Sequence, residues 1–334
     1  MSGKLHVSRK VRARLTGFAV AALLFAVFML VVRARPLSNV FALVIAVGSP
    51  YAPFVALAGL GLSLLAGRKL LAIVAVLVVA AAFVVQLPLH LGRPADAGEY
   101  AVVRILSSNL RKGEADASSF VALAKQNADV ITVSELTPEE VERFAQAGIG
   151  DDFPYRVLIP ASGAGGIGLW SRFALTAVSP RERPRNVAIT AARLQIPSVE
   201  LDPLVASVHV MSPVASETDT VDLWQRGIAA MKSVLDDFAD VAGPGAVVVA
   251  GDFNSTPDMR QFRDLLTDGY RDAVDQTGAG FVPTFPANTS MPPVLAIDHV
   301  LTRGATATSL RTETIAGSDH LALLTTVHIP TQGA

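Results

Sequence analysis

The chain has 334 residues, of which 51% are hydrophobic and 17% are charged, and its formal net charge is −1. A charged fraction below the usual quarter and a mean hydropathy of +0.44 exclude a disordered or collagen-like chain and argue against a purely soluble enzyme. Because there is no cysteine, the chain has no disulfides, no thiolate metal site and no cysteine nucleophile.

The charges divide the chain into two parts. Residues 1–92 contain nine Lys or Arg and no Asp or Glu, whereas residues 93–334 contain 19 Lys or Arg and 29 Asp or Glu. We therefore predict a basic, apolar membrane anchor over residues 1–92 and an acidic globular domain over residues 100–330. The segment between them, residues 93–99, contains Pro94 and Gly98 and is predicted to be a linker.

Three long uncharged runs predict transmembrane helices at residues 15–32, 40–66 and 70–87. Crossing the hydrocarbon core of a bilayer takes about 20 apolar residues. Pro50 and Pro53 interrupt the second run, so two spans with a re-entrant middle segment are the alternative. Arg33 and Arg35 follow the first run where a signal peptide would have small residues for cleavage, so we expect an uncleaved anchor.

The flanking charges predict the orientation in the membrane. Five Lys or Arg precede the first run, which favours a cytoplasmic amino terminus. Three crossings then place the globular domain outside the cytoplasm, in a multi-pass protein of the cell membrane. Two crossings would reverse that side.

The globular part alternates short strands with helices. Segments rich in Val and Ile predict strands at residues 100–107, 129–133, 155–159, 166–171, 174–178, 187–196, 203–210, 247–250, 295–302, 306–311 and 321–329. Apolar spacing and amino-terminal signals predict helices at residues 115–126, 138–147, 217–240 and 259–266. This pattern predicts an α/β fold in which β-sheets are covered by helices.

Polar residues able to carry chemistry lie at or near the ends of the predicted strands, where a rigid scaffold presents reactive groups. They are Asn109, Glu135, His209, Asp252, Asn254, Asp298, Asp319 and His320. Carboxylate and amide oxygens without thiolates suit Mg²⁺ or Mn²⁺. Histidines beside carboxylates supply proton transfer and phosphate hydrogen bonds. The set therefore predicts metal-dependent hydrolysis of a phosphoester.

Seven short motifs occur along the same stretch of chain. They are S-S-N-L at Asn109, V-S-E-L at Glu135, G-I-G-L-W-S-R at 166–172, S-V-H-V at His209, G-D-F-N at 251–254, A-I-D-H-V at Asp298 and S-D-H at 318–320. In these motifs and their order, residues 102–329 resemble the endonuclease/exonuclease/phosphatase superfamily, which has the DNase I-like fold. The resemblance implies a four-layer sandwich, two β-sheets flanked by helices, and a metal-dependent hydrolase of phosphate ester or anhydride bonds.

The resemblance also implies how the metal is held. Glu135 corresponds to the main ligand of the family's divalent ion, with Asn109 and Asp319 near the metal. Ser134 stands where the family commonly has Gln before this Glu. A neutral substitution beside the ligand is not expected to remove the metal.

By the same resemblance, Asp252 orients or deprotonates the attacking water. Asn254 and His209 bind the phosphate and stabilise the transition state. His320, oriented by Asp298, contacts the phosphate or transfers a proton.

The charge and the anchor bear on the substrate. Nucleic-acid binders usually carry a basic face, whereas this domain is acidic, so nucleic acid is less favoured. Tethering to the lipid bilayer favours a phospholipid or an isoprenoid diphosphate. The layout is also similar to that of VanJ-type membrane proteins, which are linked to teicoplanin resistance in actinobacteria. The alternatives are an extracytoplasmic endo- or exonuclease and a catalytically silent membrane receptor on the same fold.

Overall fold

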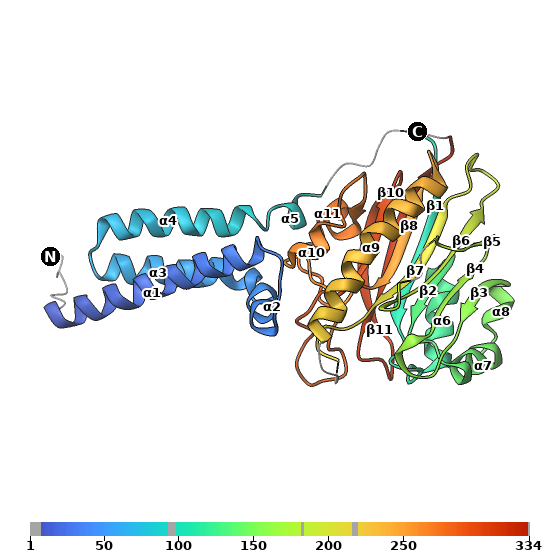
Figure 1. Ribbon diagram of the computed structural model, residues 1–334, viewed down its shortest axis with the longest axis horizontal. Coiled ribbons are helices and arrows are strands. Elements are labelled where there is room, and N and C mark those ends of the chain that lie inside the picture. The colour runs from blue at the N-terminus through green and yellow to red at the C-terminus, as the bar shows by residue number, and fades with distance from the viewer. Residues whose placement is uncertain (1–7, 93–97, 182–183, 216–219, 333–334) are drawn as a thin grey trace. The chain divides into compact units, whose positions relative to one another are not determined.

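The computed structural model describes residues 8–92, 98–181, 184–215 and 220–332 (Figure 1). It consists of two compact units. Met1–Pro88 with Asp258–Arg260 form a helical unit, and Leu89–Pro257 with Gln261–Ala334 form a globular unit. Most of the predicted linker, residues 93–97, lies outside the described residues.

The helical unit contains α1 (Arg9–Arg33), α2 (Val40–Val47), α3 (Ala52–Leu65) and α4 (Lys69–Val84), and the single turn α5 (Pro88–Leu91) follows. All three uncharged runs are therefore helical. The second run is divided by the 3₁₀ turn η1 (Ser49–Tyr51), where the chain bends by 44°. Pro50 and Pro53 explain the break, because proline has no backbone N–H to donate to a preceding turn.

The helices differ in whether they are long and apolar enough to cross a membrane. Among the described residues, α1 alone is long and apolar enough to cross a bilayer unaided, and α2 with η1–α3 is a second candidate if the bent pair is one span. The 16 residues of α4 rise only about 24 Å, which is less than the hydrocarbon thickness of about 30 Å. The number of crossings therefore stays a prediction.

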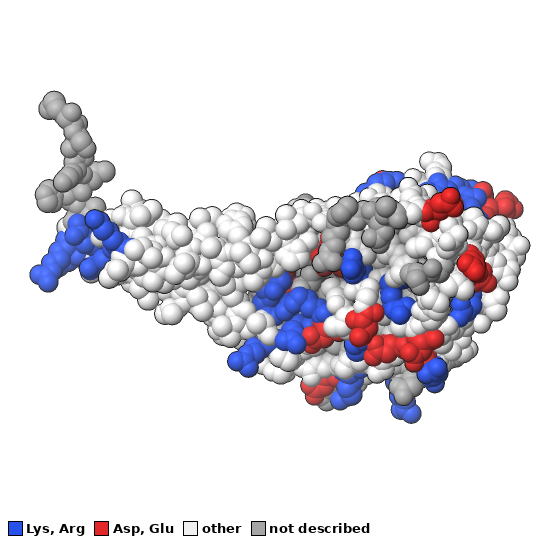
Figure 2. Space-filling view, turned by 90° about the horizontal axis from the view of Figure 1, so that it is seen from above, with Lys and Arg blue, Asp and Glu red and all other residues white. Residues whose placement is uncertain are grey.

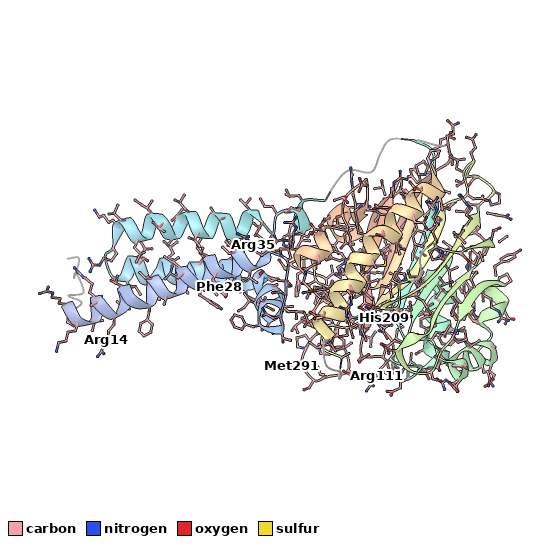
Figure 3. The ribbon with its side chains drawn as sticks, in the orientation of Figure 1. Arg14, Phe28, Arg35, Arg111, His209 and Met291 are labelled. Carbon is pink, nitrogen blue, oxygen red and sulfur yellow. The ribbon has the colours of Figure 1, made fainter. Side chains whose placement is uncertain are left out.

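The helical unit buries small side chains and exposes large ones. Ala19 and Ala26 of α1 and Ala56 of α3 are fully buried. A β-carbon on Gly59 would lie 2.8 Å from the side chain of Leu23, so α1 and α3 approach closely at this glycine. The exposed apolar side chains include Phe18, Leu24, Phe28, Phe41, Phe54, Leu64, Leu70 and Leu77 (Figure 3). Helices that pack through small residues and present large apolar ones outward are typical of lipid surroundings.

The globular unit contains two six-stranded mixed sheets. The first has the order β11 (Thr306–Thr314), β12 (Leu321–Pro330), β1 (Tyr100–Asn109), β2 (Val130–Ser134), β4 (Ile167–Ser171), β3 (Tyr155–Ile159). The second has the order β5 (Ala174–Val178), β6 (Val187–Gln195), β7 (Leu204–Val210), β8 (Val247–Asp252), β10 (Asp298–Arg303), β9 (Arg271–Asp272). The pairs β1–β2 and β7–β8 are parallel, and the other pairs are antiparallel.

Alternation along the strands builds the layers of this unit. On β1, Val103 and Ile105 point into the core between the sheets, where they meet Val248 of the second sheet. Leu106 points to the other face, where it packs with Phe120 of α6 (Ala117–Asn127). Helices α7 (Pro138–Gln146) and α8 (Ile149–Asp152) complete that outer layer, and α9 (Thr220–Ala242) covers the second sheet (Figure 1). The predicted four-layer α/β sandwich is confirmed.

Most predicted elements of the globular part form within a few residues of their expected limits. The exceptions are short. The helix predicted at 259–266 is the single turn α10 (Arg260–Arg263), and the predictions missed β9, α8 and α11 (Ala273–Thr277). Residues 217–219, the expected start of the long helix before α9, lie outside the described residues. Elements of two to five residues are too short to show a period in the sequence.

Candidate active site

In each sheet the predicted site residues lie at the ends of neighbouring strands. Asn109 ends β1 and lies beside the end of the parallel strand β2, so Glu135, the next residue, emerges next to it. In the second sheet His209 of β7 is in register with Asp252, which ends the parallel strand β8. Asp252 lies opposite Asp298, the first residue of β10. Pairing alone thus collects these residues into two groups.

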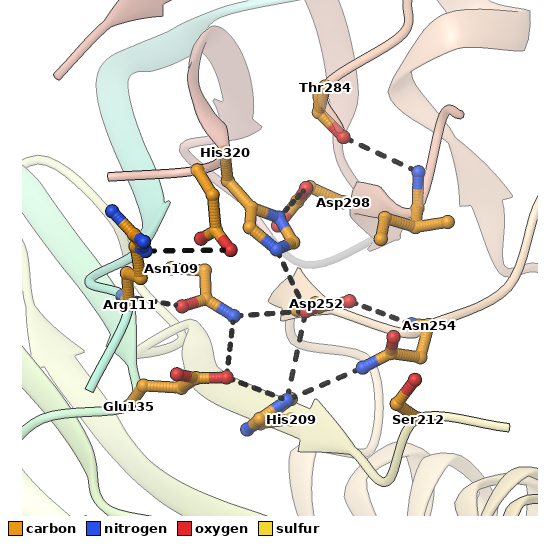
Figure 4. A network of polar contacts seen from close by, with 12 residues as sticks. Asn109, Arg111, Glu135, His209, Ser212, Asp252, Asn254, Thr284, Asp298 and His320 are labelled. Carbon is orange, nitrogen blue, oxygen red and sulfur yellow. Dashed lines mark hydrogen bonds and ion pairs between the residues drawn. The ribbon is translucent and has the colours of Figure 1, made fainter. Parts of the chain in front are cut away.

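Asn109 joins the two groups across the sandwich (Figure 4). Its amide Nδ2 donates to Glu135 Oε1 at 3.2 Å and to Asp252 Oδ2 at 3.1 Å. Its Oδ1 accepts the backbone N–H of Arg111 at 2.9 Å, which fixes the orientation of the amide. Because Nδ2 faces the carboxylates, Asn109 serves here as a hydrogen-bond donor to both of them.

Glu135 has a backbone conformation that is unfavourable for a residue with a side chain. Its φ is +59°, in the left-handed region that costs a non-glycine residue about 1–2 kcal/mol. The turn is held because the N–H of Leu136 donates to Gly166 O, and a β-carbon on Gly166 would lie 1.8 Å from Leu136 O. The Glu135 Oε2 atom accepts the backbone N–H of Lys112 at 2.8 Å. The first glycine of the G-I-G motif therefore allows the close approach that aims this carboxylate.

His209 and Asn254 form one side of the site. His209 Nδ1 lies 3.1 Å from Ala164 O and must carry the hydrogen, because a carbonyl only accepts. Its Nε2 faces Asp252 Oδ2 at 3.7 Å and Asn254 Nδ2 at 3.4 Å. Asn254, with φ +46°, also donates from Nδ2 to Val210 O at 2.8 Å. This leaves a ring nitrogen and an amide side by side at the site.

His320 and Asp298 form the opposite side. His320 Nδ1 lies 2.8 Å from Asp298 Oδ2, and its Nε2 lies 3.9 Å from Asp252 Oδ2. Burial alone would lower the pKa of His320, but Asp298 by charge and hydrogen bond, together with Asp252 and Asp319, raises it to about 10. His320 is therefore an imidazolium at neutral pH.

Asp252 lies at the centre and is almost inaccessible to solvent. Burial raises its pKa and the Asp298 carboxylate raises it further, to about 6, although His320 and His209 act in the opposite direction. One oxygen, Oδ1, accepts the backbone N–H of Asn254 at 2.8 Å. A carboxylate that titrates near neutrality between polar partners is suited to act as a base.

Asp319 lies at the rim of the site. Its side chain is 26% exposed, and its Oδ2 lies 3.8 Å from Arg111 Nε. Arg111, which the sequence did not single out, connects Asp319 to Asn109 through its own backbone N–H. The peptide N–H groups of Arg111 and Lys112 bind Asn109 and Glu135, and the side-chain pattern of a sequence does not reveal such contacts.

The donors present fit a divalent cation with a preference for oxygen. In the part of the chain that the structure describes, Asp252, Asp298 and His320 bring one ligand atom each within 4.8 Å of one another. The predicted ligands Glu135 and Asp319 add two more carboxylates at the more accessible side. Carboxylates are donors that Mg²⁺ and Mn²⁺ accept, whereas the His320 ring could bind a metal only after losing its Nε2 hydrogen. The two sets differ, and Asp298 is already hydrogen-bonded to His320, which favours Glu135.

The comparison with known families agrees with this geometry. Residues 106–320 match the Endonuclease/Exonuclease/phosphatase family. The chain belongs to this family, whose members are metal-dependent phosphoester hydrolases. A search of curated proteins found no match.

Solved structures share the fold at low sequence identity. An endonuclease/exonuclease/phosphatase from Beutenbergia cavernae DSM 12333 is 18% identical with a TM-score of 0.54, covering 69% of this chain and 72% of that one. Truncated Caenorhabditis elegans TDP2 is 12% identical with a TM-score of 0.52, covering 68% and 98%. D. rerio TDP2 complexed with a single-strand DNA product is 16% identical with a TM-score of 0.52, covering 68% and 99%. These likenesses extend over the globular part and concern its fold.

Proposed function

We propose that this protein is a membrane-anchored, divalent-metal-dependent phosphohydrolase that cleaves a phosphoester or diphosphate of a membrane- or envelope-associated substrate. The observation that carries the hydrolase part is the continuous network in which Asn109 links Glu135 to Asp252. Around Asp252 stand the His209 ring nitrogen, the Asn254 backbone N–H and the His320 ring, and groups of this kind can transfer protons or stabilise negative charge in phosphoester hydrolysis.

Glu135 is the side chain that we propose as the principal metal ligand. Within the described ranges of the chain, its hydrogen bonds come from the neutral Asn109 amide and the Lys112 peptide, and His209 Nε2 lies 3.9 Å from its Oε1. Asp319 would complete the ligands from the rim, and Asn109 would hold Glu135 in place. When bound, Mg²⁺ or Mn²⁺ supplies positive charge beside the phosphoryl oxygens. The Asp252, Asp298 and His320 group is the competing location.

The remaining groups divide the chemistry between them. Asp252 is ionised above pH 6 and accepts the proton of the attacking water. His320 presents its Nε2 hydrogen toward the same centre, and Asp298 holds the ring in that orientation. Asn254 Nδ2 and His209 Nε2 face the site together. To bind phosphate oxygens, the His209 ring would carry a hydrogen on Nε2 as well as on Nδ1, and Asn254 Nδ2 would turn the hydrogen that it does not give to Val210 O toward the phosphate.

The helical unit supports attachment to a membrane. Its exposed surface is apolar, and residues 8–91 include no Asp or Glu. Arg68 Nε lies 3.3 Å from Thr16 Oγ1, which brings the loop before α4 next to the start of α1. Lys and Arg gather at that end of the unit, whereas Arg33 and Arg35 lie at the other end of α1 (Figures 2 and 3).

This grouping strengthens the predicted orientation. Arg9, Lys10, Arg12 and Arg14 precede the apolar part of α1, and Arg68 and Lys69 join them, giving six cations at one end. Under the positive-inside rule that end is cytoplasmic. If α1, the α2–α3 pair and α4 each cross, the globular unit follows on the extracytoplasmic side.

The substrate class follows from charge and tethering. Residues 93–334 carry ten more acidic than basic side chains, which disfavours a polyanion held along its length. A site attached to a bilayer meets lipid-borne phosphoesters at high effective concentration. We therefore propose a phospholipid or an isoprenoid diphosphate. An extracytoplasmic nuclease is the second candidate, because D. rerio TDP2 of the same fold was solved with a single-strand DNA product.

The test is phosphate release by the detergent-purified full-length protein with Mg²⁺, Mn²⁺ or EDTA. The panel contains isoprenoid diphosphates, phospholipids, sphingomyelin and plasmid DNA. Asp252→Asn should abolish the activity, while Asp240→Asn, at a side chain that is 69% exposed on α9, should leave it unchanged. Metal-dependent release from a lipid substrate supports the proposal. Cleavage of plasmid alone supports the nuclease, and activity that survives Asp252→Asn contradicts both.

A further inference from the structure

A second histidine–aspartate pair lies behind the Asp252 turn and outside the network described above. His299 Nδ1 is 2.7 Å from Asp272 Oδ2, and His299 Nε2 is 2.9 Å from Ser255 O. Both side chains are only 1% exposed. Because a carboxylate and a carbonyl only accept hydrogen bonds, both ring nitrogens must carry hydrogen. His299 is thus held as an imidazolium.

Two aromatic rings pack near His299. The ring centroid of Phe262 lies 4.0 Å from that of His299, and the Phe253 centroid lies at 5.8 Å. Burial alone would lower the pKa of His299, but Asp272 by charge and hydrogen bond, the Ser255 carbonyl and the Asp298 carboxylate raise it. Water has little access to replace a lost partner here, so each of the two bonds matters.

The Ser255 carbonyl belongs to the turn that carries Asn254. Asn254 has φ +46°, a strained conformation that persists only when its surroundings fix it. The Ser255 hydroxyl donates to Phe253 O at 2.9 Å and accepts from Trp224 Nε1 at 3.0 Å. His299 fixes the peptide carbonyl of the same residue. The turn is therefore clamped by α9 through the Ser255 side chain and by β10 through its backbone.

We propose that His299, paired with Asp272, is a positioning residue that holds the Asp252–Ser255 turn, so that the Asn254 amide and the Asp252 carboxylate keep their places at the phosphate. His299 touches none of the reacting groups and acts through the Ser255 peptide. The kinetic part of this proposal rests on the proposed hydrolase function. The structural part, that His299 holds the Asp252–Ser255 turn, does not rest on that function. The two parts are measured by separate experiments.

The kinetic test uses the full-length protein, Mn²⁺ and bis(4-nitrophenyl) phosphate as a small diester. His299→Gln is expected to lower kcat by about 10–100-fold with KM changed less than about threefold, because misplacement by about 1 Å costs up to about 10²-fold. Gln276→Leu is the matched control. Gln276 of α11 is also buried and donates to Thr302 Oγ1 at 2.8 Å, and Thr302 lies near the end of β10 that is away from Asp298. The control should keep kcat within about twofold.

A double-mutant cycle separates positioning from a general loss of structure. If His299 acts through Asn254, then His299→Gln in an Asn254→Ala background lowers kcat much less than it does in the unsubstituted protein. Additive losses would overturn the proposal, as would an equal loss in Gln276→Leu. Asp272→Asn removes the charge and leaves one side-chain oxygen, so the asparagine can accept from His299 Nδ1 only by giving up the Val274 N–H that Asp272 Oδ1 accepts at 3.1 Å. It should give a smaller fall in kcat in the same direction and carries the test if His299→Gln does not fold.

The readout that needs no activity is hydrogen exchange of the peptide covering residues 251–257. The Asn254 N–H donates to Asp252 Oδ1 at 2.8 Å, and the Phe253 N–H donates to Ile297 O at 2.9 Å. Both N–H groups should exchange at least about tenfold faster in His299→Gln than in the unsubstituted protein. In Gln276→Leu their exchange rates should be unchanged. Unchanged exchange refutes the clamp. Faster exchange without any hydrolysis by the unsubstituted protein would refute the proposed function while the clamp stands.

Discussion

Replacing Asp252 with Asn should make the globular unit more stable at neutral pH while removing its activity. Burial and Asp298 raise the pKa of Asp252 from 3.8 to about 6. Since one pKa unit corresponds to about 1.36 kcal/mol, ionising this carboxyl in the folded protein costs about 3 kcal/mol above pH 6. The neutral amide of the Asp252→Asn variant avoids that cost. It also replaces the oxygen that accepts from Asn109, and losing this bond costs about 1 kcal/mol. The expected net gain is about 2 kcal/mol.

The stability gain of Asp252→Asn should depend on pH in a definite direction. Below pH 4 the carboxyl is protonated in both the folded and the unfolded protein, so the substitution should give no gain in stability there. Between pH 4 and 6 the folded protein binds the proton more tightly than the unfolded chain, so the unsubstituted protein loses stability as pH rises. The advantage of Asp252→Asn should therefore grow from pH 4 and level off above pH 6.

The assay is denaturant unfolding in EDTA from pH 4 to 8, followed by tryptophan fluorescence. The two tryptophans of the chain, Trp170 and Trp224, are both buried in the globular unit, so the signal reports that unit even in detergent. Asp240→Asn on the surface of α9 is the control and should show no pH-dependent difference. A stability difference that is the same at pH 4 and pH 8 would refute the reasoning.

Three further predictions concern pH, metal and the helical unit. Activity should rise near pH 6 as Asp252 loses its proton and fall near pH 10 as His320 loses its own; a profile flat from pH 5 to 8 would contradict the assignment of the base. Glu135→Gln should raise the Mn²⁺ concentration for half-maximal activity by at least about tenfold in a metal titration, and an unchanged value would move the metal to the competing group. Gly59→Leu should lower the temperature at which the detergent-solubilised protein aggregates, since overpacking costs about 1–3 kcal/mol, whereas Gly61→Leu, with open space around it, should not.

The residues predicted for the site lie together because strand pairing converts separation along the chain into proximity. Asn109 and Glu135 are 26 residues apart, yet they end parallel neighbours and meet at 3.2 Å. His209 and Asp252 come together in the same way in the second sheet. A polar residue directly after an apolar strand can be recognised in a sequence. The residues that the two parallel strand pairs bring together could therefore be proposed from the sequence.

Contacts made by the backbone or by very short elements gave no such signal. Arg111 and Lys112 bind Asn109 and Glu135 through their N–H groups, which every residue except proline has. Asp272 belongs to β9, which has two residues and no recognisable period. The number of membrane crossings is undecided for a different reason: α4 is apolar but short, and hydropathy alone does not distinguish a tilted span from a packed helix.

Asp298 and His299 are consecutive residues of β10, and they act on two different parts of the site. Successive side chains of a strand point to opposite faces. Asp298 shares its face with Val300 and the core between the sheets, where it holds His320 against Asp252. His299 points the other way, to Phe262 and the Ser255 carbonyl, and holds the turn that carries Asn254. Two histidine–aspartate pairs thus meet at one dipeptide of β10. A shift of β10 by one residue would exchange their faces and disrupt both, so the register of this strand against β8 determines the geometry of the site from two sides.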